Sequence, residues 1–128
     1  MKVCFNTEKG PKAVGPYSTL TMTSDLVFVS GMIPLDPKTN EIVEGGIENQ
    51  TRQALQNIKT VLEEVGLTMN HALKTTVLLT DLGSFGQVNA IYGEYFAPDF
   101  PARACYEVSK LPKGALIEIE VIAARTLE

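Results

Sequence analysis

The side chains best suited to chemistry lie in the last quarter of this 128-residue chain. Arg103 and Cys105 alternate along one segment rich in strand-forming residues, and Glu118 lies on a second such segment. If the two segments form a hairpin that turns near Lys110, Arg103 lies about opposite Glu118. The spacing therefore predicts a guanidinium and a carboxylate side by side on a sheet.

This pair has two interpretations. As a cross-strand ion pair it would add at most about 1 kcal/mol to stability. As a functional site, Arg103 would bind a substrate carboxylate through two parallel hydrogen bonds while Glu118 activates a water molecule. Spacing alone favours the ion pair, because structural ion pairs are commoner than active sites. In either case the arginine is expected to favour the ionised form of Glu118.

Cys105 is the other reactive group on this segment. A cysteine nucleophile needs a nearby base to form the thiolate. The single histidine, His71, falls in a turn region and is expected at the surface. We therefore interpret Cys105 as a buried thiol. Because Cys4 and Cys105 form neither a CxxC pair nor a cluster with histidine, no zinc site is predicted.

Hydrophobic periodicity predicts the elements that must position these residues, in the order βββ-α-β-α-ββ. The expected helices are 47–65 and 85–96, and the expected strands are 3–5, 17–22, 26–33, 73–80, 102–108 and 116–124. Two helices on one sheet leave the other sheet face to be covered, for example by a partner subunit. We expect a single α+β domain over residues 1–128.

Composition limits the class of protein. The formal net charge is −4 and the basic residues are scattered, which argues against nucleic acid as a partner. The first residues lack the apolar run of a signal peptide, and no segment approaches the length of a membrane span. These features predict a cytoplasmic protein that does not bind membranes.

The chain contains the motifs AVGPYS (13–18), VSGMIP (29–34), PARACYEV (101–108) and IEIEV (117–121). Together these motifs resemble the RidA (YjgF/YER057c/UK114) family. The C-terminal ones combine an arginine, a Leu-Pro pair and a glutamate at the separations typical of that family. The resemblance extends over nearly the whole chain. The other matching stretches are QALQNI (53–58), residues 75–82 and LPKG (111–114).

The resemblance implies a chorismate-mutase-like fold, a mixed sheet with two helices packed on one face. It implies homotrimers whose clefts lie between subunits. It also implies hydrolytic deamination of 2-imino and enamino acids, such as 2-aminoacrylate and 2-iminobutanoate, to 2-keto acids and ammonia. No metal and no cofactor are expected. The expected partner is a small 2-imino or 2-keto acid.

Residue roles follow from the same resemblance. Arg103 matches the arginine that binds the substrate carboxylate, and Glu118 matches the carboxylate that positions the hydrolytic water. Cys105 matches a residue whose backbone groups, not its thiol, face the substrate. The remaining matches line the same cleft and are Tyr17, Ser30, Gly31 and Asn89.

The chain departs from the family pattern at three positions. Ala104 stands where serine is common, and Tyr106 stands where a smaller aliphatic residue is common. Strand alternation predicts that Tyr106 faces away from Arg103, so we expect it to change packing only. Met32 stands where many relatives have glutamine, and its position beside the cleft predicts an effect on substrate preference.

Two other functions remain open at this point. A regulatory protein could use the Arg103 pocket to bind keto acids or amino acids without turnover. Such a protein would need Arg103 but not Glu118. A translation inhibitor acting on RNA, an activity associated with some relatives, is opposed by the acidic charge.

Overall fold

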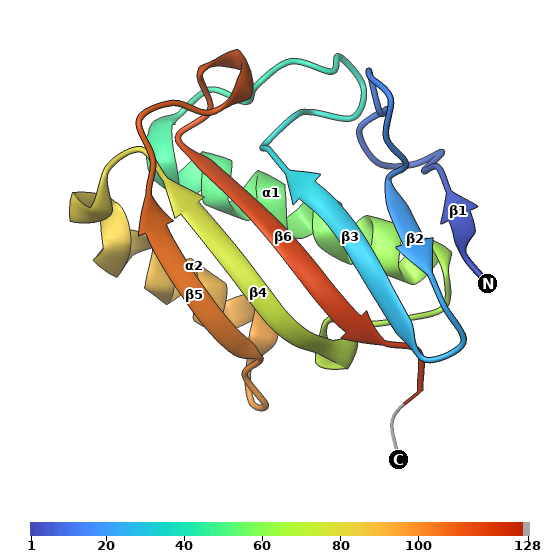
Figure 1. The fold of residues 1–128 in the computed structure, drawn as a ribbon. Coiled ribbons are helices and arrows are strands. Elements are labelled where there is room, and N and C mark those ends of the chain that lie inside the picture. The colour runs from blue at the N-terminus through green and yellow to red at the C-terminus, as the bar shows by residue number, and fades with distance from the viewer. Residues whose placement is uncertain (127–128) are drawn as a thin grey trace.

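The computed structural model describes residues 1–126, which form one mixed β-sheet with two long helices (Figure 1). The helices are α1 (Gly46–Glu64) and α2 (Phe85–Phe96). The strands are β1 (Val3–Phe5), β2 (Leu20–Met22), β3 (Leu26–Met32), β4 (Ala72–Leu79), β5 (Ala102–Glu107) and β6 (Ile117–Ala124). Short 3₁₀ helices are η1 (Met69–His71), η2 (Leu82–Ser84) and η3 (Pro112–Gly114). The predicted α+β class and element order are confirmed.

The sheet has the strand order β1-β2-β3-β6-β4-β5. All neighbouring strands are antiparallel except β4 and β5, which run parallel. Parallel neighbours need a crossover connection, and α2 supplies it. The predicted hairpin between β5 and β6 is therefore wrong, because β4 lies between these two strands.

Burial explains this placement of β5 and β6. Alternate residues of β6, among them Ile117 and Ile119, are fully buried, so this strand belongs in the middle of the sheet. No residue of β5 is fully buried, and its outer edge pairs with no other described strand. A strand with little apolar surface to bury is tolerated at the edge.

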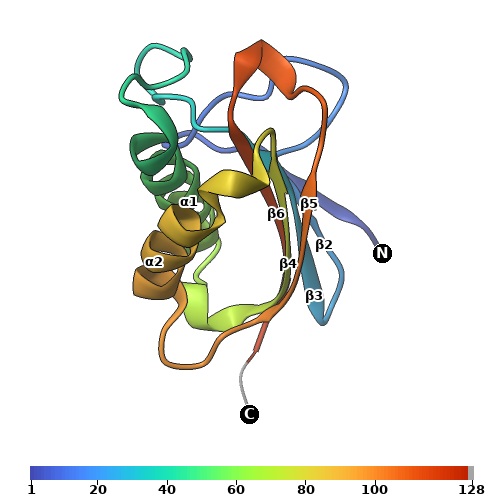
Figure 2. The same cartoon turned by 90° about the vertical axis from the view of Figure 1, so that its left-hand side faces the viewer.

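Both long helices cover the same face of the sheet (Figure 2). The buried face of α1 follows a helical period and includes Ala54, Ile58 and Val61, all fully buried. The helix ends before Gly66, whose φ of 79° suits glycine best. These side chains pack against the inward residues of β3, β4 and β6 to form the core.

The opposite face of the sheet carries no helix within residues 1–126 (Figure 2). Glu118 and Glu120 point to this open face, because they alternate with the buried residues of β6. Phe28 and Tyr106 are among its exposed aromatic side chains. Tyr106 lies on the face opposite Arg103, as alternation predicted.

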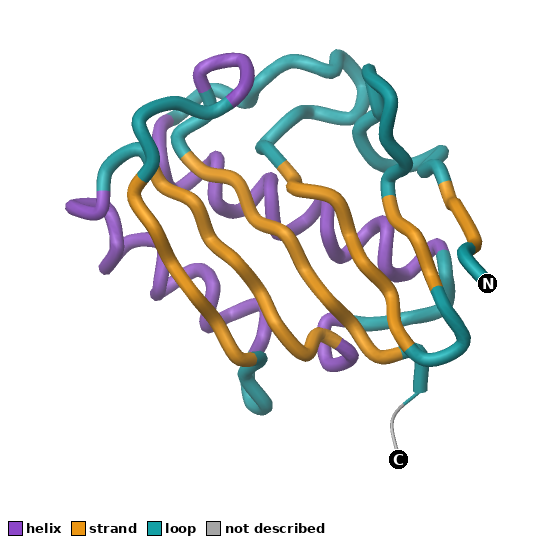
Figure 3. Tube along the Cα trace, in the orientation of Figure 1, coloured by secondary structure: helices purple, strands orange, loops and turns teal. Residues whose placement is uncertain are grey.

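The longer loops lie at one end of the sheet (Figure 3). The predicted strand 17–22 begins only at Leu20, because Thr19 closes a loop instead. The Thr7 backbone N–H donates to Thr19 Oγ1 at 3.0 Å, and the Thr19 N–H donates to Asn6 Oδ1 at 3.2 Å. The segment 7–19 is therefore a loop whose ends are held together.

Candidate functional site

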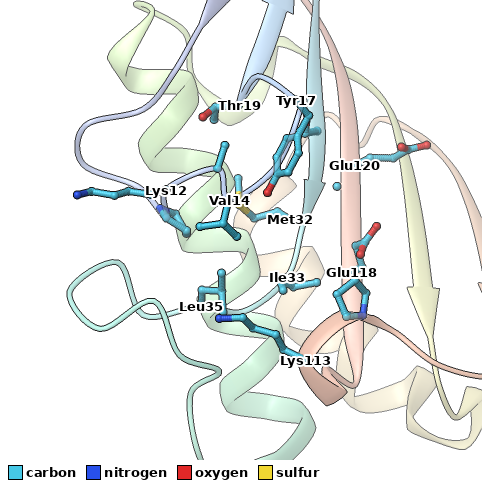
Figure 4. Close-up of a pocket in the computed structure, with 15 residues that line it drawn as sticks. Lys12, Val14, Tyr17, Thr19, Met32, Ile33, Leu35, Lys113, Glu118 and Glu120 are labelled. Carbon is cyan, nitrogen blue, oxygen red and sulfur yellow. The ribbon is translucent and has the colours of Figure 1, made fainter.

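The main pocket lies on the open face, at the end of the sheet where the longer loops lie (Figure 4). Its volume is about 560 Å³. Pro112 and Lys113 close one side, and the loop 7–19 closes another. Four of the predicted site residues line it, namely Tyr17, Ser30, Gly31 and Glu118.

Glu118 supplies a carboxylate to this pocket from the middle of the sheet. A register shift in β3 between Val29 and Met32 brings Gly31 against it. Burial raises the pKa of Glu118 above its ordinary value, and the nearby Glu120 carboxylate raises it further. The expectation that Arg103 favours the ionised form of Glu118 is wrong within one chain, because Arg103 is not near enough to act.

Tyr17 reaches the pocket from the loop 7–19, with its side chain pointing toward Met32 (Figure 4). Ser30 holds the end of this loop: its hydroxyl donates to the Ser18 carbonyl at 2.7 Å, and its N–H donates to the Thr19 carbonyl at 3.0 Å. Ser30 therefore positions the loop rather than presenting a free hydroxyl.

A carboxylate on α1 anchors the same loop. Glu64 accepts hydrogen bonds from the Thr7 hydroxyl and from the Glu8 N–H. Sequence reasoning missed this contact. Thr7 and Glu8 are polar, which is a local signal for hydrogen bonding, but their partner Glu64 is more than fifty residues away in sequence.

Arg103 lies elsewhere, on edge strand β5 and on the helix-covered side. It pairs with Thr75 of β4, which is fully buried under α2. Its Nη1 donates to Asn89 Oδ1 at 2.7 Å. Its guanidinium carbon lies 5.1 Å from the ring centre of Phe85 and 4.8 Å from that of Tyr92. The two aromatic contacts were not predicted, although all three α2 residues share one helix face.

Arg103 and Glu118 therefore do not lie side by side in one chain. Their strands are separated by β4, and Thr75, the partner of Arg103, pairs with Val121 rather than with Glu118. Strand geometry puts the two Cα atoms about 14 Å apart. Alternation also directs the two side chains to opposite faces of the sheet.

Cys105 shares the face of Arg103 and packs against the core. Burial raises the pKa of its thiol, and the Arg103 charge offsets this only in part. His71 precedes β4 and accepts the Thr68 N–H through Nδ1 at 3.1 Å. His71 lies six positions before Val77, the β4 partner of Cys105, which corresponds to about 20 Å along the strand. The raised pKa of the Cys105 thiol and its distance from His71 both oppose a thiolate nucleophile at this position.

The predicted site residues thus form two groups. The pocket group consists of Tyr17, Ser30, Gly31 and Glu118, and the edge group consists of Asn89, Arg103 and Cys105. Within the described chain, no three His, Cys, Asp or Glu side chains are grouped to hold a metal ion. Neither long helix is apolar enough to cross a membrane, a result that covers the described residues alone.

Comparisons with known proteins agree with this architecture. A family model described as Endoribonuclease L-PSP matches residues 7–125. The chain is 50% identical over 123 residues to a RutC family protein of Pyrococcus horikoshii, covering 96% of this chain and 98% of the relative. It is 44% identical over 119 residues to the human 2-iminobutanoate/2-iminopropanoate deaminase, covering 93% of this chain and 87% of that protein.

A solved structure, E. coli TdcF with bound serine, has a TM-score of 0.91 and 36% identity, covering 97% of this chain and 99% of that one. The fold and the site define a small α+β domain with a pocket of small-molecule size against an open sheet. The chain belongs to the Endoribonuclease L-PSP family, which is the RidA (YjgF/YER057c/UK114) family that its motifs predicted.

Proposed function

We propose that this protein hydrolyses short 2-imino acids to 2-keto acids and ammonia, in clefts between the subunits of a homotrimer. The observation that carries the proposal is the division of the site residues into two incomplete groups. One group holds a carboxylate in a pocket on the open face. The other presents Arg103, an exposed residue on the free edge strand β5.

A second copy of the chain can complete both groups. Its β5 edge, packed on the open face, would bring its Arg103 to the pocket that holds Glu118. The same contact would cover the exposed side chains of Phe28 and Tyr106. The assembly therefore explains why Arg103 and Glu118 do not meet within one chain.

The chemistry needs only these groups and water. Arg103 binds the substrate carboxylate and so fixes the adjacent imine carbon. Glu118 accepts a proton from water as the water oxygen bonds to that carbon. With the imine nitrogen protonated at the start, this attack gives a neutral carbinolamine, and Glu118 returns the proton to its nitrogen. The C–N bond then breaks and ammonia leaves, while the hydroxyl proton passes to the Glu118 carboxylate and the C=O bond of the keto acid forms. Burial and the Glu120 charge raise the pKa of Glu118 within one chain, which makes its carboxylate a stronger base than that of an exposed glutamate.

Subunit mixing tests this arrangement. A threonine dehydratase would supply 2-iminobutanoate, and keto-acid formation would be followed with wild-type protein, Arg103→Ala and Glu118→Gln. We expect each variant to lose most of the rate enhancement, about 100-fold or more for Glu118→Gln. Size-exclusion chromatography with light scattering would give the oligomeric state.

Subunits of the two inactive variants, refolded together, should regain activity. If each site uses Arg103 of one subunit and Glu118 of its neighbour, random mixing restores about one quarter of the wild-type rate. No recovery from mixed trimers would overturn the shared site. No rate enhancement by the wild-type protein would overturn the deaminase proposal itself.

The two other functions give different results. A protein that binds keto acids without turnover would need Arg103 for binding, and Glu118→Gln would change nothing. A translation inhibitor that acts on RNA would bind RNA with a steep salt dependence, and it would cleave RNA if it acts as the family description Endoribonuclease L-PSP reads. The net charge of −4 opposes the second of these.

A further inference from the structure

Helix α2 presents three side chains to Arg103 from one face. Phe85, Asn89 and Tyr92 are spaced i, i+4, i+7, so they lie in line along the helix. Asn89 accepts a hydrogen bond from Nη1 at 2.7 Å. The guanidinium carbon lies over both rings, 5.1 Å from the ring centre of Phe85 and 4.8 Å from that of Tyr92.

The Tyr92 ring is itself held in place. Its hydroxyl lies 2.6 Å from Thr75 Oγ1, and Thr75 is the β4 residue that pairs with Arg103. The ring also packs against Phe96, with ring centres 4.5 Å apart. Tyr92 is 5% exposed and Thr75 is fully buried. A ring with these contacts has little freedom to turn.

The start of α2, where Phe85 lies, is also fixed. The Leu82 N–H donates to a carboxylate oxygen of Glu107 at 2.9 Å. Asp81 accepts the Gly83 N–H at 2.8 Å and so caps η2, which leads directly into α2. The Tyr92 ring and the backbone that carries Phe85 are therefore held in place by contacts within the chain.

We infer that Phe85 and Tyr92 are positioning residues that hold the Arg103 guanidinium in the orientation needed to bind a substrate carboxylate, an inference that rests on the proposed function. Contact with two ring faces attracts the cation and restricts its orientation. Asn89 takes one N–H group, which leaves other donors of the guanidinium for the ligand. Without these contacts, the Arg103 side chain would lose conformational freedom when the ligand binds, and this entropy loss would lower the affinity.

Phe85→Leu tests the aromatic contact, because it keeps an apolar side chain and removes the ring. Phe85 is 37% exposed, so the change should be tolerated. Phe100→Leu is the matched control, since Phe100 is an exposed phenylalanine in the segment after α2. Binding of the product 2-oxobutanoate would be measured by calorimetry, together with KM and kcat for 2-iminobutanoate.

We expect Phe85→Leu to raise the Kd for 2-oxobutanoate by about 3- to 30-fold. KM should rise by a similar factor while kcat changes less, because Glu118 is untouched. Phe85→Tyr should restore both constants, since it restores a ring. Phe100→Leu should resemble the wild-type protein, and the melting temperatures of all three variants should stay close together.

Arg103→Ala separates this inference from the proposed function. If Arg103→Ala leaves 2-oxobutanoate binding unchanged, the proposed function fails and the inference fails with it. If Arg103→Ala abolishes binding but Phe85→Leu matches Phe100→Leu, the positioning role alone is overturned. The same conclusion follows if Phe85→Tyr binds as weakly as Phe85→Leu, because the ring is then not what matters.

Tyr92→Phe tests the hydrogen bond to Thr75 while keeping the ring in the core. We expect a smaller rise in KM than in Phe85→Leu, because the ring still lies under the guanidinium. The side-chain Nε–H resonance of Arg103 should broaden or shift in this variant. An unchanged resonance and an unchanged KM would exclude the Tyr92 hydroxyl from positioning Arg103.

Discussion

Gly31 lies directly against the carboxyl group of Glu118: a Cβ atom at position 31 would come within 2.9 Å of Glu118 Cδ. No Cβ atom tolerates such a contact, so Glu118 can keep its position only beside a glycine. The close approach depends on the shift in register of β3 between Val29 and Met32. The absence of a side chain at Gly31 therefore leaves the space that the Glu118 carboxyl group occupies.

Gly31→Ala should therefore move the Glu118 side chain without removing it. We expect kcat for 2-iminobutanoate to fall by about 10-fold or more, because displacing a general base from its water is costly. Binding of 2-oxobutanoate should weaken less, since Arg103 is unchanged. Gly86→Ala in α2 is the control, because a Cβ there has nothing within 4 Å. Equal activity of the two variants would contradict this role of Gly31.

The pH dependence of hydrolysis should follow the pKa of Glu118, which burial and Glu120 raise within one chain and which the partner subunit's Arg103 would lower in the proposed assembly. A general base acts when it is ionised, so kcat/KM should rise with pH through this pKa. Glu120 is one cause of the shift, so Glu120→Gln should lower the pKa and move the rise to more acidic pH. Glu41→Gln, at an exposed position outside the pocket, is the control. An unmoved profile in Glu120→Gln would show that burial alone raises the pKa.

The stability of the folded protein should fall as pH rises, because folding raises the pKa of Glu118. A carboxyl group whose pKa is higher in the folded than in the unfolded state stabilises the fold while protonated. This contribution is lost as pH rises through the folded pKa. Compared with Glu118→Gln, the wild-type protein should lose melting temperature between acidic and neutral pH. Parallel curves for the two proteins would contradict the raised pKa.

The helices and strands were predictable because their signals are local. The buried residues of α1 repeat with a helical period, and Ile117 and Ile119 alternate with the two glutamates of β6. The partner of β5 was not predictable in this way. A hairpin to β6 and a crossover to β4 produce the same alternation along β5, so the pattern within β5 does not distinguish them.

The site was predictable as a set of residues but not as an arrangement. Family resemblance named Arg103 and Glu118, and the structure puts them on opposite faces of one sheet. The positions of Phe85 and Tyr92 depend on where α2 lies relative to β5. Such contacts arise from tertiary packing, which spacing along a single strand does not record.

The anchor between Thr7 and Glu64 should control the loop that carries Tyr17. Thr7→Val removes the hydroxyl that donates to Glu64 and accepts from the Gly10 N–H. We expect a loss of about 1–3 kcal/mol in the free energy of unfolding. Amide exchange should accelerate over residues 8–18 more than in the core. Thr60→Val, in the C-terminal third of α1, is the control, and equal exchange in both variants would contradict the anchor.

Met32 should set the preference for substrate side chains. It is 7% exposed, and it belongs to the core while also lining the pocket. Val14, Ile33 and Leu35 add to this apolar wall (Figure 4). A long apolar substrate side chain would displace water from the wall, and this contributes to transition-state binding.

Met32→Gln should therefore reduce discrimination in favour of apolar imines. We expect kcat/KM for the imine of leucine, generated with an amino acid oxidase, to fall about 10-fold relative to that for 2-iminobutanoate. Met32→Leu keeps the wall apolar and should leave this ratio near that of the wild-type protein. Melting temperatures would show whether the buried amide also weakens the core. If both variants change the ratio equally, side-chain shape rather than polarity at position 32 sets the preference.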